Sequence, residues 1–233
     1  MSANARPVIT VHGHASNPGT VTELTVYERA LERSLSPEIL PAHIGVLVDG
    51  NRRWAAQRGL STREGHAAGA ERIIDFLAWC TELSIPQVSL YMLSIENLKR
   101  PEQELIGLVA VIDNFLGRLV DSARGPVRAI GNIDLIPRQL HERLDWAIAQ
   151  TAHLPGVRVN IAVGYGGRHE ITEAVRSMMR EAAAKGLTLD ELADSFTDAD
   201  ITAHVYTKDQ PDPDLVIRTS GEQRLSGFML WQS

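Results

Sequence analysis

An acid, a glycine, an amide and two arginines stand in consecutive positions early in the chain, directly after a short apolar run. The apolar run is residues 44–48, and the polar residues that follow it are Asp49, Gly50, Asn51, Arg52 and Arg53. A carboxylate can hold Mg²⁺, which takes oxygen ligands and typically uses one or two carboxylates together with substrate phosphates. Glycine lets a phosphate approach the backbone, and arginine donates to phosphate oxygens in pairs. The spacing therefore predicts a site for a phosphorylated substrate and a divalent cation.

Asp49 also has a structural interpretation, because aspartate is a favoured residue at the N-terminus of a helix. On that interpretation the carboxylate would cap the helix that begins after Gly50. The first turn of the same helix would offer free backbone N–H groups to an anion. The position of Asp49 at the end of a buried strand favours the magnesium interpretation, since ligands of open α/β sheets bind at such ends.

Three further polar or glycine-rich clusters follow predicted strands. They are Ser-Ile-Glu-Asn at residues 94–97, Gly-Tyr-Gly-Gly-Arg at residues 164–168 and Arg-Thr-Ser-Gly-Glu-Gln-Arg at residues 218–224. Together with Arg100, the first of them forms a polar patch that also caps the helix beginning at Pro101. Each cluster alone is compatible with ordinary loop chemistry. Because the carboxyl ends of parallel strands lie along one edge of a sheet, we predict that all four clusters meet at one shared site.

Arg218 and Arg224 are the strongest candidates for anion binding outside the first cluster. They flank a Thr-Ser-Gly turn that follows two apolar residues. An arginine fork matches the oxygens of a phosphate, whereas a surface ion pair is the alternative for either residue alone. Ser226 is a weaker candidate, since a solvated turn residue also explains it. His66, at the start of a predicted helix, is either a phosphate donor or a structural histidine.

Alternating helices and strands would position these clusters. Apolar spacing predicts helices over residues 67–83, 101–120, 137–152 and 168–185, and strands over residues 44–48, 87–93, 127–130, 157–163 and 215–217. Residues 1–21 show no periodicity, so we expect a flexible N-terminal lead-in. A single domain over residues 22–233 is expected to open with a helix that ends near Pro37. The alternation is typical of an α/β domain with a mostly parallel central sheet flanked by helices.

The bulk composition disfavours several classes of function. The 233 residues carry a net charge of −6, which argues against general nucleic-acid binding. The chain lacks a P-loop motif, a Gly-x-Gly-x-x-Gly motif after its first strand and a Cys/His cluster for zinc. The single cysteine, Cys80, cannot form an internal disulfide, and no secretory signal or membrane-length apolar run is visible. We therefore expect a cytoplasmic protein without a transmembrane segment.

Five ordered motifs give the chain a resemblance to the cis-prenyltransferase family, the undecaprenyl diphosphate synthases and their short-chain relatives. The motifs lie at residues 43–55, 65–69, 94–104, 160–168 and 214–224. The resemblance covers about residues 41–232. The Asp-Gly-Asn-Arg-Arg-Trp form of the first motif and the long Arg-Thr-Ser-Gly-Glu-Gln-Arg run look most like actinobacterial short-chain members, such as (Z)-farnesyl diphosphate synthases.

The resemblance implies a homodimeric α/β enzyme with an apolar tunnel beside its diphosphate site. It implies Mg²⁺-dependent condensation of isopentenyl diphosphate with a short allylic diphosphate, creating a cis double bond, and peripheral membrane contact through the product. Asp49 would hold the Mg²⁺, and Asn97 would stand where a proton is removed. The substrate-binding residues that it implies are Gly50, Asn51, Arg52, Arg53, Trp54, Thr62, His66, Ser94, Ile95, Glu96, Leu98, Arg100, Arg218, Arg224, Leu225 and Ser226.

The chain departs from the family pattern at three places. Thr62 stands where the family often has an arginine, and Leu98 stands where long-chain members have tryptophan, which is compatible with a shorter product. The family pattern continues beyond Ser233 with a metal-binding glutamate, a strand and a helix, so we expect a C-terminally truncated domain in which Asp49 is the one carboxylate for Mg²⁺. The alternative function is a catalytically silent partner subunit. Such subunits usually lose the aspartate and the arginines that this chain keeps.

Overall fold

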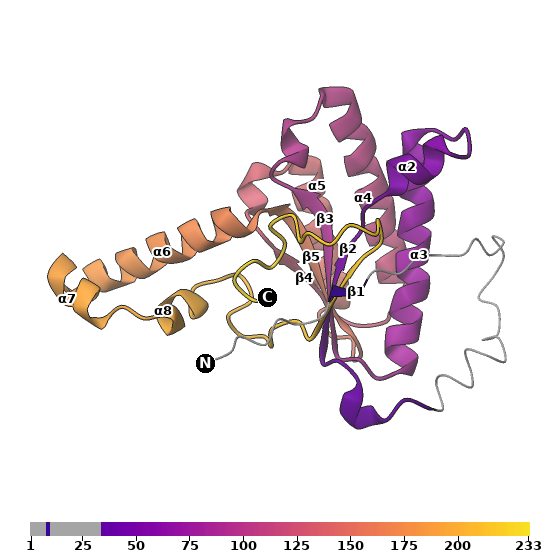
Figure 1. Cartoon of the computed structure of the whole chain (residues 1–233). Helices are drawn as coiled ribbons and strands as arrows, with labels where there is room; N and C mark the ends of the chain where they lie inside the picture. Colours follow the sequence, from indigo (N-terminus) through magenta and orange to yellow (C-terminus); the bar gives the residue numbers. More distant parts are fainter. Residues whose placement is uncertain (1–7, 10–33) are drawn as a thin grey trace.

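The computed structural model describes Val8–Ile9 and residues 34–233, which form an α/β domain around a parallel sheet (Figure 1). The sheet has six strands in the order β1-β6-β2-β3-β5-β4, and every neighbouring pair runs parallel. The strands are β1 (Val8–Ile9), β2 (His43–Leu47), β3 (Gln87–Ser94), β4 (Val127–Ile130), β5 (Arg158–Tyr165) and β6 (Leu215–Arg218). The predicted α/β class with a parallel sheet is confirmed.

Helices follow most strands, as the sequence predicts. They are α2 (Asn51–Ala56), α3 (Thr62–Glu82), α4 (Glu102–Ser122), α5 (Arg138–Thr151), α6 (Gly167–Ala184), α7 (Leu189–Ser195) and α8 (Asp198–Thr202), with short 3-10 turns at Pro37–Ile39, Asn97–Lys99 and Ile133–Leu135. In Figure 1, α6 projects away from the sheet, with α7 at its far end and α8 on the way back. No helix in the described part of the chain is long and apolar enough to cross a membrane.

Two apolar clusters cover the two faces of the sheet. On one face, Leu77 of α3, Phe115 of α4 and Leu144 of α5 pack in a cluster with alternate residues of the strands, such as Leu90. On the other face, Phe228 packs with residues of β2, β5 and β6 in a smaller cluster. Burial on both faces explains why all five residues of β2 are buried, as expected for a central parallel strand.

The differences between predicted and observed elements arise where capping rather than apolar spacing fixes an end. Helix α3 begins at Thr62, five residues before the predicted start, because Ser61 and Glu64 form a capping box. Helices α7 and α8 were not predicted, since they are short, and each begins with a capping box of its own. Strand β1, which pairs with β6, lies within the predicted lead-in. It was not predicted, because a strand of two residues is too short to show an apolar period. The predicted helix before Pro37 lies almost wholly outside the described residues.

A buried histidine lies at the other end of the sheet from the predicted site. His43 is fully buried at the start of β2, where its ring nitrogens are hydrogen-bonded to Ser89 Oγ at 2.8 Å and to the Pro211 carbonyl at 2.7 Å. Burial lowers the pKa of His43 from its ordinary value of 6.5, against the smaller raising effects of the Pro211 carbonyl and nearby aspartates. The imidazole is therefore neutral in the folded protein at neutral pH.

We expect acid to destabilise the fold partly through His43. The unfolded chain takes up this proton near pH 6.5, whereas the buried ring resists it, so the stability is present above this pH and is lost as the pH falls towards the lowered pKa. The loss is at most about 1.4 kcal/mol per pH unit. Urea unfolding at pH 7.5 and 5.5 should show a smaller pH effect in His43→Gln than in wild type. His153→Gln, at an exposed position, is the control and should keep the wild-type dependence.

Candidate active site

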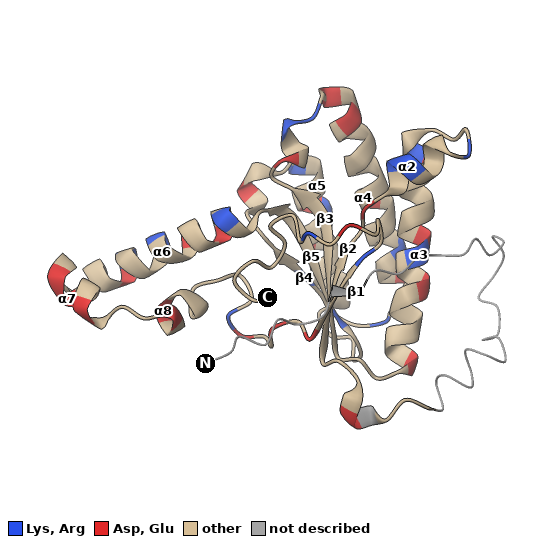
Figure 2. Cartoon of the chain, in the orientation of Figure 1, with Lys and Arg blue, Asp and Glu red and all other residues tan. Residues whose placement is uncertain are grey.

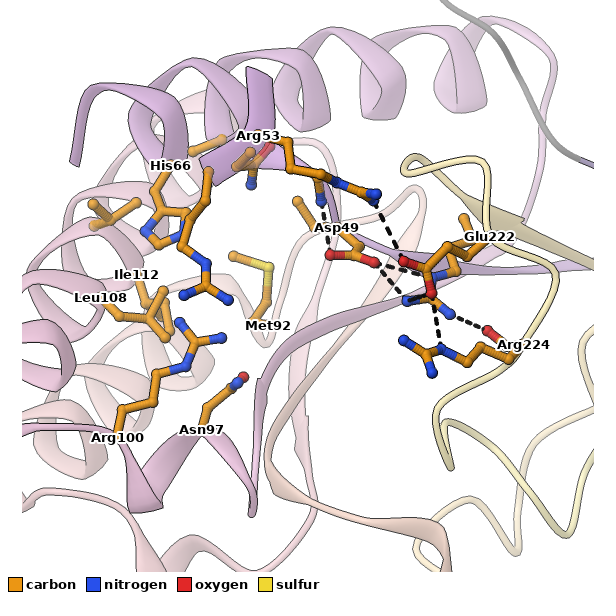
Figure 3. Close-up of a pocket in the computed structure, with 17 residues that line it drawn as sticks. Asp49, Arg53, His66, Met92, Asn97, Arg100, Leu108, Ile112, Glu222 and Arg224 are labelled. Atoms are coloured by element: carbon orange, nitrogen blue, oxygen red, sulfur yellow. Dashed lines mark hydrogen bonds and ion pairs between the residues drawn. The ribbon is translucent and has the colours of Figure 1, made fainter. Parts of the chain in front are cut away.

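The carboxyl ends of β2, β3 and β6 face α2, α3 and α4 across a cavity of about 430 Å³ (Figure 3). Its polar wall consists of Gly50 and a set of charged, amide and imidazole side chains: Asp49, Asn51, Arg52, Arg53, His66, Asn97, Arg100, Arg218, Glu222 and Arg224. The rest of the lining is apolar and consists of Val48, Ala70, Met92, Leu108, Val111 and Ile112. The cavity therefore offers one ligand a charged region for its head and an apolar region for its tail.

A second cavity of about 260 Å³ adjoins the first and shares part of its wall. The shared residues are Val48, Asp49, Met92, Asn97, Arg100 and Arg218. The residues that line the second cavity alone are Leu47, Tyr91, Ser94, Glu96 and Ser226. Asp49 and Arg218 thus stand between two spaces that can each take a ligand.

Asp49 and Arg218 form a forked ion pair at the ends of neighbouring strands. Arg218 Nη2 and Nε donate to Asp49 Oδ2 at 2.6 and 3.1 Å. The backbone N–H of Gly50 donates to the other carboxylate oxygen, Oδ1, at 2.7 Å. Gly50, with a φ of 94°, is itself the N-cap residue of α2, and no side chain caps that helix. The alternative interpretation of Asp49 as a helix cap is therefore wrong.

Thr219 fixes the backbone of Asp49. Its hydroxyl accepts the Asp49 N–H at 3.0 Å and donates to the Asp49 carbonyl at 2.6 Å. Sequence reasoning did not single out Thr219, and its place directly after Arg218 in the last cluster was the one signal available. The contact ties the ends of β2 and β6 together, so the Asp49 carboxylate is held in place before any ligand binds.

The surroundings of Asp49 keep its carboxylate ionised. Burial raises its pKa, but hydrogen bonds from the Arg218 and Ser220 side chains and the Gly50 backbone, with the positive charge of Arg218, outweigh burial. The net effect places the Asp49 pKa below its ordinary value of 3.8. The carboxylate is therefore charged at neutral pH, as a metal ligand must be.

Glu222 joins three arginines on the far side of the same pair (Figure 3). Its carboxylate lies 2.8 Å from Arg224 Nε, 3.2 Å from Arg218 Nη2 and 3.5 Å from Arg53 Nη2. Arg218 also donates to the Arg224 carbonyl oxygen. Sequence reasoning included Glu222 in the last cluster but assigned it no role. The arginines are thereby assembled by contacts within the protein.

His66 and Arg100 form a second group of donors, which Figure 3 shows on the opposite side of the cavity from Glu222. Burial, followed by the positive charges of Arg100 and Arg52, lowers the pKa of His66, so its ring is neutral at pH 7 and offers one N–H donor. Arg52 forms an ion pair with Glu104, in which Arg52 Nη1 lies 3.9 Å from Glu104 Oε2. Within residues 34–233, Arg100 makes no ion pair, which leaves this guanidinium available to an anionic ligand.

Ser94 and Asn97 fix each other at the end of β3. The Asn97 side-chain oxygen accepts the Ser94 N–H at 3.1 Å, and the Ser94 hydroxyl accepts the Asn97 N–H at 3.0 Å. This contact sets which end of the amide faces inward, so the Asn97 NH₂ group is the one left for a ligand. Asn97 lines both cavities, as a residue between two substrates would.

Five predicted substrate-binding residues line neither cavity. They are Trp54, Thr62, Ile95, Leu98 and Leu225. Trp54 lies under the Arg58 guanidinium at 4.5 Å, and Thr62 is the exposed first residue of α3. Leu98 and Leu225 pack against the two apolar clusters. Their roles toward substrate stay predictions.

The glycine-rich cluster at residues 164–168 also lines neither cavity, so the prediction that all four clusters form the wall of one site is wrong for this cluster. It instead holds the segment that follows Arg224. The Gly167 N–H donates to the Gly227 carbonyl at 2.8 Å, and the Tyr165 hydroxyl accepts the Met229 N–H at 3.1 Å. The cluster thus supports the arginine-bearing loop from behind.

Replacing Gly167 with alanine should destabilise the protein by about 1–3 kcal/mol, the usual cost of overpacking. An added Cβ would lie 2.5 Å from the Gly227 oxygen and 2.6 Å from Leu230 Cβ, so the loop would have to move. Gly107→Ala, inside α4 with nothing within 4 Å, is the matched control and should stabilise the protein by up to about 1 kcal/mol. Urea unfolding measures both, and equal effects of the two variants would contradict this role.

The donor set around Asp49 suits a hard divalent cation that a substrate helps to hold. In the described residues no group of three acidic, histidine or cysteine side chains converges, so a fully protein-built metal cage is absent there. Mg²⁺ typically takes one or two protein carboxylates and completes its shell with substrate phosphates and water. The residues present therefore fit Mg²⁺, and Asp49 would be its protein ligand.

The fold and this site together define a class of enzyme. A parallel sheet carries an acid and paired arginines at its carboxyl edge, beside a cavity that is apolar at one end and polar at the other. Such a site handles phosphorylated substrates with apolar tails. Residues 47–233 match the family model of undecaprenyl diphosphate synthases, and the chain belongs to this family of prenyltransferases. The resemblance seen in the sequence is confirmed.

Curated relatives and solved structures agree with this assignment. The chain is 53% identical over 209 residues to a (2Z,6E)-farnesyl diphosphate synthase of Thermobifida fusca, covering 89% of this chain and 82% of that protein. It is 49% identical over 207 residues to isoprenyl transferase 1 of Streptomyces avermitilis, covering 89% and 80%. The crystal structure of lavandulyl diphosphate synthase from Lavandula x intermedia, in complex with dimethylallyl diphosphate, is similar at a TM-score of 0.77 and 31% identity, with 84% of each chain covered.

Proposed function

We propose that the protein condenses isopentenyl diphosphate with a short allylic diphosphate, giving a short-chain cis prenyl diphosphate and pyrophosphate. The observation that carries the proposal is the pair of adjoining cavities with Asp49 and Arg218 between them. Two substrates held on either side of this pair would have their reacting carbons close together, which removes much of the entropic cost of a bimolecular step. The relatives named (2Z,6E)-farnesyl diphosphate synthase support a short product.

The allylic substrate fits the first cavity. Its diphosphate would lie among the side chains of Asn51, Arg52, His66 and Arg100. The guanidinium of Arg100, which makes no ion pair with the described residues, would bind it. Its isoprenoid tail would enter the apolar lining. The donors gather near α2, where Figure 2 shows basic residues, whereas α7 and α8 carry acidic ones.

Isopentenyl diphosphate fits the second cavity. Arg218 and Ser226 line this cavity. Arg224 and Glu222 line the first cavity, and Glu222 holds Arg224 beside Arg218, which belongs to the wall that the two cavities share. An arginine fork can bind two oxygens of one phosphate. We therefore assign Arg218, Arg224 and Ser226 to the isopentenyl diphosphate.

The reaction breaks the bond between C1 of the allylic group and its diphosphate oxygen, and the electron pair leaves with the diphosphate. The double bond of the isopentenyl group then forms a bond to C1, and a proton is lost to form the new cis double bond. Arginines already held in place stabilise the charge that develops on the leaving group, because they need no rearrangement at that moment. Bound Mg²⁺ would withdraw charge from the same oxygens.

Asn97 would stand beside the carbon that loses the proton. Its amide oxygen is a weak base and already accepts the Ser94 N–H at 3.1 Å. We therefore assign Asn97 to holding the isopentenyl group, and the proton to an oxygen of the released pyrophosphate, the stronger base in the site.

A homodimer is the assembly that we propose for this enzyme. In Figure 1 the arm formed by α6, α7 and α8 stands clear of the sheet. A second subunit packed on this arm would bury its exposed apolar side chains, which are Met179, Leu187, Leu189 and Phe196. Light scattering after size exclusion tests the assembly, and a monomer at micromolar concentration would contradict it. The cytoplasmic location stays a prediction from the sequence.

The decisive experiment is a product assay. The protein is incubated with Mg²⁺, radiolabelled isopentenyl diphosphate and geranyl or dimethylallyl diphosphate, and the products are dephosphorylated and analysed by mass spectrometry. We expect labelled products extended by one or a few isoprene units, and none when Mg²⁺ is chelated. Absence of any extended product with every primer would refute the proposal.

A further inference from the structure

Groups of the protein itself take up most of the N–H donors of Arg218, one of the two arginines assigned to isopentenyl diphosphate. Of the five N–H groups of the Arg218 guanidinium, two donate to Asp49 and one to the Arg224 carbonyl. The Glu222 carboxylate oxygen Oε2 lies 3.2 Å from Arg218 Nη2 and pairs with the second N–H of that nitrogen. Arg218 has one N–H left, on Nη1, and one is too few for a forked contact with a phosphate.

One of the two carboxylates must therefore give way before Arg218 can grip a diphosphate. Asp49 is fixed through both of its oxygens and through its backbone, by contacts with Gly50, Arg218 and Thr219. Among the described residues, Glu222 is held by its arginine partners and by a long 3.4 Å hydrogen bond from its own N–H to the Ser220 hydroxyl. It lies in a loop without regular structure, with a side chain one-third exposed. Glu222 is the carboxylate that can leave.

We propose that Glu222 is an internal counter-ion. Its carboxylate binds the arginines assigned to isopentenyl diphosphate, Arg218 and Arg224, until the diphosphate of the substrate displaces it. Its carboxylate holds Arg53, Arg218 and Arg224 together against their mutual repulsion (Figure 3). On binding, diphosphate oxygens take over the same donors, and the side chain swings toward solvent. This inference rests on the assignment of Arg218 and Arg224 made above.

Two opposite roles of Glu222 predict opposite results. An internal counter-ion competes with the ligand, so its neutralisation should tighten diphosphate binding. A carboxylate that merely orients the arginines would, once neutralised, leave binding unchanged or weaken it. Glu222→Gln separates them, since the amide keeps the size and an acceptor oxygen but loses the charge.

The test is titration calorimetry of the full chain with inorganic pyrophosphate, at low salt and with EDTA, so that no metal takes part. Glu222→Gln should bind pyrophosphate roughly tenfold more tightly than wild type, the loss of one charge-assisted competitor. Glu71→Gln, which removes the same charge from a surface pair with Arg118, should stay within about twofold. In steady-state assays the KM for isopentenyl diphosphate should fall without a rise in kcat. Unchanged or weaker pyrophosphate binding by Glu222→Gln overturns the proposal.

Two additional variants keep the result interpretable. Glu222→Asp, which retracts the carboxylate, should bind pyrophosphate a few-fold more tightly than wild type, and it carries the test if Glu222→Gln does not fold. Arg224→Gln should weaken binding. Failure of the wild-type protein to bind pyrophosphate would overturn the assignment of Arg218 and Arg224 to isopentenyl diphosphate together with this proposal. Binding that depends on Arg224 but ignores Glu222 would overturn the counter-ion alone.

Discussion

Replacing Asp49 with asparagine is expected to lower kcat by about a thousandfold while pyrophosphate binding stays within about threefold of wild type. The carboxylate is ionised in the folded protein, because contacts from Arg218, Ser220 and Gly50 outweigh the effect of burial. Asparagine preserves the shape but supplies no negative charge for a divalent cation, whereas the arginines that hold the diphosphates remain. The loss should therefore appear in turnover and not in anion binding.

Steady-state kinetics with saturating substrates, together with calorimetry of pyrophosphate in EDTA, measures the two halves of this expectation. Asp113→Asn is the matched control, since Asp113 also pairs with an arginine, Arg143 at 3.5 Å, but lies outside both cavities. It should retain wild-type kcat. More than a tenth of wild-type kcat in Asp49→Asn would contradict the role of Asp49.

The fold was predictable from the sequence where apolar burial dictates the pattern. Five successive buried residues make β2 recognisable, and the apolar face of α4 marks that helix to within two residues at either end. Elements fixed by caps alone were missed, because a capping box such as Thr188 with Glu191 spans only four residues and leaves no period. Strand β1 was missed for a related reason, since two residues acquire meaning only beside β6.

The candidate site was predictable where a strand end delivers a chemical group to the edge of the sheet. Asp49, Asn97 and Arg218 are of this kind, and all three line both cavities. The apolar lining was not predictable in detail, because residues such as Ala70 and Ile112 look like core residues of helices. Glu222 was also hidden, since an acid in a run with two arginines suggests a solvated loop until distances are known.

The ion pair between Arg218 and Asp49 depends on the planar shape of the guanidinium as well as on its charge. Arg218 is 5% exposed, and it binds Asp49 through two nitrogens on one edge while reaching the Arg224 carbonyl through the third. Lysine carries the same charge but offers one nitrogen and no planar fork. Charge is therefore not enough at this position, and the geometry of the guanidinium is what places Asp49 and the loop together.

Arg218→Lys should accordingly lower kcat/KM for isopentenyl diphosphate by about 100-fold to 1,000-fold, from the lost charge-assisted hydrogen bonds and the misplaced Asp49. Arg118→Lys, at a surface ion pair with Glu71, should change it by no more than about twofold. Wild-type activity in Arg218→Lys would show that a point charge suffices and that the forked pair does not position the acid.

In Arg218→Gln, Asp49 loses the main contacts that lower its pKa, so burial raises this pKa. The acid limb of the pH profile of activity should therefore move upward relative to wild type. The titration of the substrate phosphates is common to both proteins, so this difference reports on Asp49.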